Sequence, residues 1–141
     1  MGQYHKLVNL DKKEVVEPHD IGLFSKQYEH TGTDASLADA IYLLVMSSPA
    51  SGGGDWPHTQ VSGRWCGDRV VILGDYTQAD AIQGYEGDAS TLYGDSQEWL
   101  NISPEVRDAL SQVFPITYKL EERTLGGETY TSVSRISVGA W

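Results

Sequence analysis

The stretch GDRVVILGDY (residues 67–76) decides how this chain folds. Its centre, RVVIL (69–73), is rich in β-branched apolar side chains and lacks the alternation of polar and apolar residues that marks a half-exposed strand. Strands of this composition are usually covered on both faces. The sequence therefore predicts a strand in the middle of a sheet, ended by Gly74 and Asp75.

An amphipathic helix is predicted before this strand, over residues 35–47. Thr33 or Asp34 can cap it, and Asp39 follows Ser36 by three residues as an approximate capping box. Its apolar side chains recur at helical spacing, at Leu37, Ile41, Leu44 and Val45. A shorter helix is expected over residues 21–29, with its inward side chains at Leu23, Phe24 and Tyr28.

The segment SPEVRDALSQVFP (103–115) gives the clearest helix signal. Ser103 is the expected N-cap, and Pro104 takes the first helical position, where its missing N–H costs nothing. Pro115 prevents continuation of the helix. The expected buried stripe is Val106, Ala109, Leu110 and Val113.

Two hairpins complete the predicted elements. Near the N-terminus, residues 4–10 and 15–18 flank DKKE (11–14), and the proline at 18 ends the second strand. Residues 116–138 form another hairpin around Gly126 and Gly127. A two-residue loop would pair Tyr118 with Arg135, whereas a three-residue loop (126–128) pairs Tyr118 with Ile136. The three-residue loop gathers the apolar side chains on one face, so it is the predicted one.

These elements predict an α+β fold, with a mostly antiparallel sheet, two or three helices packed on one face, and a C-terminal β-hairpin. A length of 141 residues, 40% of them hydrophobic, suits one compact domain over residues 1–141. The single cysteine, Cys66, excludes an internal disulfide. Because the N-terminus also lacks the apolar segment of a signal peptide, we expect a cytoplasmic protein that does not enter a membrane.

The charge balance points toward some partners and away from others. With a net charge of −10, the chain should be repelled by nucleic acids and anionic membranes. Residues 70–106 hold seven acidic side chains and no Lys, Arg or His. They form either a solvated surface that keeps the protein soluble or a docking face for a basic protein partner. The residues assigned to such a face are Asp80, Glu86, Asp88, Asp95 and Glu98.

Residues 51–76 contain the candidates for chemistry. The glycine-rich loop 51–55 follows a helix and lacks the spacing of a phosphate-binding loop, which favours a flexible connector. Cys66 could act as a nucleophile with His58 as base, but no cysteine-hydrolase signature surrounds it, and a lone cysteine is more often a small buried hydrophobe. No metal-ligand spacing occurs. We therefore assign no catalytic residue, metal or cofactor.

Asp68, Arg69 and Asp75 bracket the strand at 69–73. They could form a structural ion pair at a strand end, or orient a polar ligand in a cleft. The residues assigned to ligand binding under the second interpretation are Gly52, Gly53, Gly54, Asp55, Asp68, Arg69 and Asp75.

Three blocks together have a familiar pattern: MGQYHKLVNLDKKEVVEPHDIG (1–22), SGGGDW (51–56) and GRWCGDRVVILGDY (63–76). The chain resembles a group of small proteins of actinobacteria, their phages and some archaea, a group without an established activity. The resemblance implies a bacterial or phage origin and supplies no catalytic residue. The position of Cys66 is often Ala in that group, which argues against a catalytic cysteine.

The leading functional hypothesis is a non-enzymatic protein of phage or bacterial origin that binds another protein, such as a basic host factor. The alternative is a protein that binds a small molecule or nucleotide, or a hydrolase, with its pocket formed by residues 51–55 together with Asp68, Arg69 and Asp75.

Overall fold

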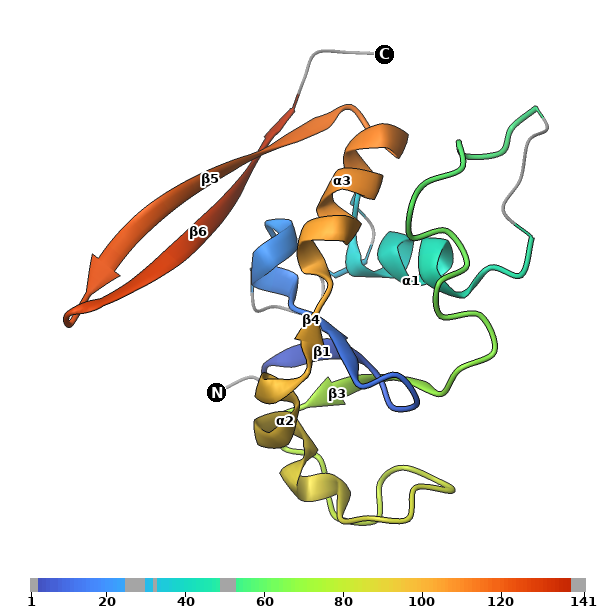
Figure 1. Cartoon of the computed structure of the whole chain (residues 1–141), viewed down its shortest axis with the longest axis vertical. Coiled ribbons are helices and arrows are strands. Elements are labelled where there is room, and N and C mark those ends of the chain that lie inside the picture. The colour runs from blue at the N-terminus through green and yellow to red at the C-terminus, as the bar shows by residue number, and fades with distance from the viewer. Residues whose placement is uncertain (1–2, 25–29, 32, 49–52, 138–141) are drawn as a thin grey trace.

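A four-stranded sheet lies at the centre of the computed structural model, which describes residues 3–24, 30–31, 33–48 and 53–137 (Figure 1). The strand order is β3-β1-β2-β4, formed by β3 (Val70–Gly74), β1 (His5–Asn9), β2 (Glu14–Val16) and β4 (Leu100–Asn101). β1 is antiparallel to β2 and β3, whereas β2 and β4 are parallel. The α+β class and the N-terminal hairpin are confirmed, and the parallel pair makes this sheet mixed.

The apolar strand β3 lies at the edge of the sheet that the described residues form, so its predicted central position is wrong. Ile72 is 53% exposed, whereas Leu73 is buried. The strand beside it, β1, is buried from Lys6 to Asn9. The sequence does not indicate a central position for β1, because the strand contains the polar residues Lys6 and Asn9. In the folded protein both are buried and make hydrogen bonds with residues far away in the sequence.

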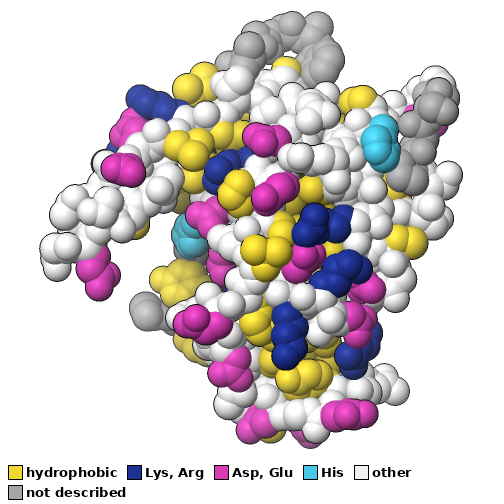
Figure 2. All heavy atoms as spheres, viewed as in Figure 1, with side chains coloured by type: hydrophobic (Ala, Val, Ile, Leu, Met, Phe, Trp, Pro, Cys, Tyr) yellow, Lys and Arg dark blue, Asp and Glu magenta, His cyan; other side chains and the backbone are white. Residues whose placement is uncertain are grey.

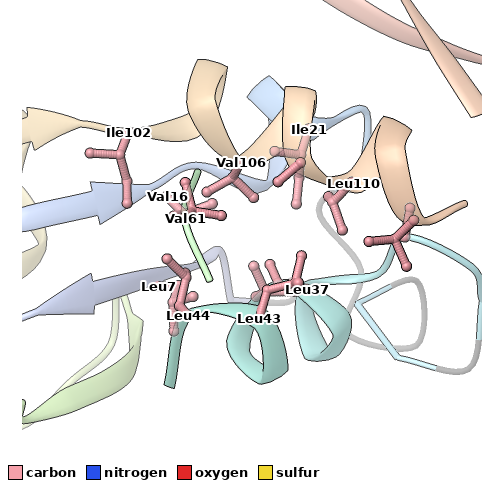
Figure 3. Close-up of a cluster of buried hydrophobic side chains, with 14 of the residues drawn as sticks. Leu7, Val16, Ile21, Leu37, Leu43, Leu44, Val61, Ile102, Val106 and Leu110 are labelled. Atoms are coloured by element: carbon pink, nitrogen blue, oxygen red, sulfur yellow. The ribbon is translucent and has the colours of Figure 1, made fainter. Parts of the chain in front are cut away.

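Each face of the sheet packs on its own hydrophobic cluster. Leu7 and Val16 face α1 (Leu37–Val45) and α3 (Ser103–Val113), and Figure 3 shows their side chains pointing toward those of the two helices. Val8 and Val15 pack on the opposite side, against residues 82–99. That segment contains η3 (Ala89–Thr91), α2 (Leu92–Asp95) and η4 (Ser96–Glu98). The two long helices therefore share one face, as predicted, and the short α2 covers the other.

The N-cap residues of the two long helices lie one to three positions from the predicted ones. Ser36 caps α1: its Oγ accepts from the backbone N–H of Asp39, and its own backbone N–H donates to Asp39 Oδ2 at 2.9 Å. In α3, Ile102 occupies the N-cap position, and Ser103 is the first helical residue. Ser103 Oγ accepts a 2.8 Å hydrogen bond from the backbone N–H of Glu17, so a contact with the end of the N-terminal hairpin replaces the predicted cap.

The predicted buried stripe of α3 is confirmed, since Val106, Ala109, Leu110 and Val113 are all buried. On α1 the buried residues are Leu37, Ala40, Leu43 and Leu44, whereas Val45 is exposed.

The predicted helix at 21–29 falls partly outside the described residues, because 25–29 are not among them. In its described part a 3-10 turn, η1 (Pro18–Ile21), ends at Gly22. Leu23 is buried as expected, but Phe24 is 71% exposed.

The C-terminal hairpin consists of β5 (Ile116–Leu125) and β6 (Glu128–Ser137), which form a separate two-stranded sheet. Tyr118 pairs with Arg135 and Leu125 with Glu128, so the loop has two residues and the predicted register is wrong. Gly126 and Gly127 have φ values of 62° and 85°, which a type I′ turn requires. The prediction chose the register that places the apolar side chains of the hairpin on one face, as burial of that face would require. The hairpin instead extends away from the main sheet (Figure 1) and most of its side chains are exposed, so burial does not determine its register.

Arg135 fastens this hairpin to the rest of the protein. Its Nη2 and Nε donate to the carbonyl of Ile21 at 2.8 and 3.1 Å, its Nη1 donates to the carbonyl of Asp34 at 2.8 Å, and Nη2 also reaches the carbonyl of Ala35. A Cβ atom on Gly22 would lie 2.6 Å from Arg135 Cγ, and Gly22 has a φ of +74°. Glycine at this position therefore allows the close approach of the arginine.

Replacing Arg135 by alanine should lower the free energy of unfolding by about 2 kcal/mol, because three carbonyl groups lose a charged donor. Urea denaturation followed by circular dichroism measures the loss. Arg123→Ala is the matched control: Arg123 is exposed and pairs with Glu121 on the same hairpin, so this variant should have a stability near that of the wild type. Equal losses in the two variants would contradict this role for Arg135.

In the part of the chain that the structure describes, no helix is both long enough and apolar enough to cross a bilayer.

Candidate functional site

The acidic side chains after β3 lie on the outside of the segment that covers the second face of the sheet. Ala89 and Leu92 are buried against that face, which holds the segment in place. The five carboxylates assigned from the sequence are all exposed, and we call them the acidic face: Asp80, Glu86, Asp88, Asp95 and Glu98. In Figure 2 the lowest part of the molecule, where Figure 1 places this segment, shows Asp and Glu side chains, while Lys and Arg side chains lie over its middle.

No Lys, Arg or His among the described residues forms an ion pair with the acidic face. Asp88 also has a local role: its Oδ1 accepts from the backbone N–H of Ser90 at 2.9 Å and so caps η3. The hydrogen bonds from Ser90 lower the pKa of the Asp88 carboxyl, which therefore stays ionised at neutral pH. The other four carboxylates are directed to solvent without such bonds, so they can contact a partner.

Eight of the ten lysine and arginine side chains make contacts elsewhere. Six of them pair with carboxylates outside the acidic face: Lys6, Lys12, Arg64, Arg69, Lys119 and Arg123. Arg107 and Arg135 donate instead to backbone carbonyls. The negative potential of the acidic face is therefore not neutralised by these neighbours.

Asp68 and Arg69 connect the start of β3 to the β1–β2 turn. Asp68 Oδ2 accepts hydrogen bonds from Asn9 Nδ2 at 2.9 Å and from Lys12 Nζ. Both bonds lower the pKa of the Asp68 carboxyl, and the bond from Lys12 has the larger effect. Arg69 donates from its backbone N–H and Nε to Asp11 at 2.7 and 2.9 Å. Asp68 and Arg69 thus pair with residues at the β1–β2 turn rather than with each other. These contacts favour a structural role for the two side chains over the binding of a polar ligand.

Asp75 lies at the opposite end of β3, where its Oδ1 accepts from the backbone N–H of Tyr4 at 3.1 Å. Of the four residues assigned in the glycine loop, Gly54 and Asp55 line a cavity, Gly53 is exposed, and Gly52 lies outside the described residues. Asp68, Arg69 and Asp75 do not line that cavity. The structure therefore distributes the proposed ligand residues over three separate places.

The cavity has a volume of about 500 Å³ and lies between α1 and residues 54–62. Its main polar and aromatic side chains are Asp39, Tyr42, Asp55, Trp56 and His58. Residues 63–65 hold the loop against the helix, because the N–H groups of Gly63 and Trp65 donate to the carbonyls of Leu43 and Leu44, each at 2.8 Å. These bonds also satisfy two carbonyls at the C-terminal end of α1.

Sequence reasoning missed Asp39 and Tyr42 as cavity residues. Asp39 was identified only as a helix cap, which it also is. Tyr42 is 64% exposed and falls outside the apolar stripe of α1. The sequence did offer one indication of the cavity: Tyr42 is an aromatic residue on the side of the helix away from the apolar stripe, and such a side chain often belongs to a contact surface.

Cys66 is exposed, so it is not the small buried hydrophobe that the sequence favoured. The two arginines nearest to it in sequence, which could lower the pKa of a thiol if they lay beside it, pair with carboxylates instead: Arg64 with Glu14 and Arg69 with Asp11. Among the described residues, no three His, Cys, Asp or Glu side chains are grouped so that they could hold a metal ion.

A buried carboxylate connects β2 to residues 64–65. Glu14 Oε1 accepts from Trp65 Nε1 at 2.7 Å and from Arg64 Nε at 3.0 Å, while its Oε2 accepts from Arg64 Nη2 at 2.6 Å. Glu14 is 6% exposed and Trp65 is fully buried. The bond from Arg64 holds the pKa of Glu14 below its ordinary value, although burial acts in the opposite direction. This network holds residues 64–65, which follow directly after the segment 54–62 that lines the cavity.

Lys6 is a buried cation on the other face of the sheet, 1% exposed. Its Nζ donates to the carbonyl of Tyr93 at 2.8 Å, lies 4.2 Å from the centre of the Tyr93 ring, and is 3.6 Å from Glu17 Oε1. Burial lowers the pKa of Lys6 and raises that of Glu17. These contacts place Lys6 in a structural role, since they join β1 to the segment that carries the acidic face.

Comparison with known proteins gave no family model, no curated protein and no solved structure that matches this chain.

Proposed function

We propose that this protein acts without catalysis, by binding a basic surface of another protein through the acidic face. The observation that carries the proposal is the exposure of five carboxylates on one ordered segment, none of them paired with a described cation. Ionised groups in this arrangement attract an oppositely charged surface and increase the rate of encounter.

The anchoring of the segment supports the same function. Leu92 and Ala89 are buried, and Lys6 binds the carbonyl of Tyr93, so the carboxylates are held on a fixed scaffold. A preorganised surface loses less conformational entropy on binding than a mobile one. The resemblance of three sequence blocks to small actinobacterial and phage proteins supports a bacterial or phage setting, and for such a setting we propose a host factor as the partner.

Neutralising the acidic face should abolish capture of the partner. The test variant carries Asp80→Asn, Glu86→Gln, Asp95→Asn and Glu98→Gln, and it keeps Asp88 because that residue caps η3. The matched control changes four other exposed carboxylates and so removes the same charge: Asp34→Asn, Asp108→Asn, Glu122→Gln and Glu128→Gln.

Each tagged protein is used to capture partners from a bacterial lysate, with quantitative mass spectrometry of what is retained. A basic protein should be retained by the wild type and the control but not by the test variant. Retention should weaken as salt rises from 0.1 M to 1 M, which shortens the Debye length from about 10 Å to about 3 Å. A partner retained equally by both variants, or at all salt concentrations, would exclude binding through the acidic face.

A further inference from the structure

The strand β3 has an open side, to which no described strand is paired. On its other side it pairs with β1, and the hydrogen bond from the N–H of Leu10 to the carbonyl of Arg69 shows which residues bond in that direction. The N–H and C=O groups of successive residues in an antiparallel strand point to alternate sides, so those of Val70 and Ile72 point away from β1. Neither residue makes a backbone hydrogen bond on that side with any described residue.

This edge lacks the features with which proteins keep edge strands from associating. Residues 70–74 contain no charged side chain and no proline, and Ile72 is 53% exposed. The other edges formed by described strands differ, since β4 has only two residues and both β5 and β6 carry charged side chains. An exposed apolar edge is a template for the addition of a further strand.

The surface beside this edge is suited to an apolar side chain. Ile72 lines a cavity of about 480 Å³ together with Leu37 and Ile41 of α1. Residues directly opposite each other on paired strands lie on the same face of a sheet. The residue opposite Ile72 on an added strand would therefore lie next to this cavity, which favours a strand with an apolar residue at its centre.

The charges at the two ends of β3 indicate which strand fits. Arg69 precedes the strand and Asp75 follows it; Arg69 is exposed and Asp75 is partly exposed. When a second β3 is placed antiparallel to the first with Ile72 opposite Ile72, Arg69 of each copy lies opposite Asp75 of the other, because position 72 is midway between them. The outward N–H and C=O of Ile72 then form the central hydrogen-bonded pair. The two pairs of opposite charge fall in the other class, in which the side chains lie closer together.

From these features we propose that two copies of this chain pair through β3, antiparallel and centred on Ile72, so that one sheet continues across a symmetric dimer. In a two-fold interface the same surface serves both copies, as this register requires. Each chain has a net charge of −10, but at about 0.15 M salt the Debye length of about 8 Å screens charges that lie farther apart. The dimer does not depend on the function of the acidic face.

Two measurements on the unmodified protein test the dimer. Analytical ultracentrifugation from about 1 µM to about 1 mM should show an equilibrium between monomer and dimer. Hydrogen exchange of the backbone amides, measured by nuclear magnetic resonance at both ends of this range, identifies the surface. The N–H of Ile72 should be protected only at the high concentration, where it bonds to the second copy. The N–H groups of Val71 and Leu73, which face β1, should be protected at both concentrations.

Ile72→Lys should raise the dissociation constant of the dimer by about tenfold or more, because it places two like charges opposite each other and removes the central apolar contact. Leu120→Lys is the matched control: it adds the same charge at an exposed apolar position of the C-terminal hairpin, and it should dimerise as the wild type does.

Three results would overturn the proposal. The first is a chain that stays monomeric at the highest concentration, whatever other strand the edge binds. The second is a dimer that Ile72→Lys leaves intact, or that Leu120→Lys weakens equally. The third is an N–H of Ile72 that exchanges at the same rate in the monomer and the dimer. The exchange experiment needs no variant, so it decides the matter even if Ile72→Lys does not fold.

Discussion

Replacing Glu14 by alanine is expected to lower the free energy of unfolding by about 4 kcal/mol, the largest effect of any substitution considered for this protein. The carboxylate is the acceptor for the fully buried indole N–H of Trp65 and for two nitrogen atoms of Arg64. Alanine leaves the indole N–H without a partner in the core, and it leaves the guanidinium of Arg64 partly buried without its counter-charge. Urea denaturation measures the loss.

Two further variants separate the causes. Glu14→Gln keeps an oxygen that can accept from Trp65 but removes the charge that pairs with Arg64, so its loss should lie between those of the wild type and the alanine variant. Glu122→Ala removes an exposed carboxylate of the hairpin and should change stability little. If Glu14→Ala were no more damaging than Glu122→Ala, the buried network would have no energetic role.

The pH dependence of this effect has a definite sign. In the folded protein the pKa of Glu14 lies below its ordinary value of 4.5, chiefly through the hydrogen bond from Arg64. The unfolded chain therefore binds a proton more readily, and the stability that the ionised carboxylate contributes is present above that value and is lost as the pH falls below it. The difference in stability between wild type and Glu14→Gln should accordingly shrink as the pH falls below 4.5.

Lys6→Met should lower the free energy of unfolding by about 3 kcal/mol at neutral pH. Methionine keeps most of the apolar stem, but the carbonyl of Tyr93 loses its donor and Glu17 loses its cation. Burial already raises the pKa of Glu17, and removal of the lysine raises it further. The ionised carboxylate then lies half-buried next to an apolar side chain.

The destabilisation by Lys6→Met should therefore decrease as the pH is lowered from neutrality toward 4.5, the ordinary pKa of a glutamate, because Glu17 with its raised pKa takes up a proton in the folded variant before it does so in the unfolded chain. Adding Glu17→Gln should recover part of the stability at neutral pH, because the unpaired charge is then absent. Lys119→Met, on the exposed hairpin, is the matched control. A loss that does not vary with pH, or one that the second substitution does not reduce, would show that Lys6 acts only through the bond to Tyr93.

The two elements with the clearest local signals, α3 and the N-terminal hairpin, were predicted correctly. The periodicity of residues 103–113, with Pro104 and Pro115 at its ends, identifies α3 and its buried stripe without knowledge of the rest of the chain. The N-terminal hairpin is equally local. The exposure of the acidic face also follows from the sequence, because a run of carboxylates without cations cannot be buried at an acceptable cost.

Features that depend on distant residues could not be predicted in this way. β1 contains Lys6 and Asn9, which look unsuitable for a central strand until Tyr93 and Asp68 supply their partners. The register of the C-terminal hairpin pairs Arg135 with Tyr118, and from there Arg135 reaches carbonyl groups that are far from it in sequence. The cavity combines Asp39 and Tyr42 of α1 with Trp56 of a loop. No pattern within either segment indicates that they meet.

The topology of the main sheet also determines when the protein can fold as it is synthesised. β1 and β2 adjoin in sequence, but their outer neighbours are β3 at 70–74 and β4 at 100–101, and α3 follows directly. Pairings between such distant segments are slow to form because a long loop must close first. The apolar faces of the N-terminal hairpin are therefore not fully covered until residues 100–113 have left the ribosome. During that interval the nascent chain exposes Leu7, Val8, Val15 and Val16, and it is most open to chaperones and to aggregation.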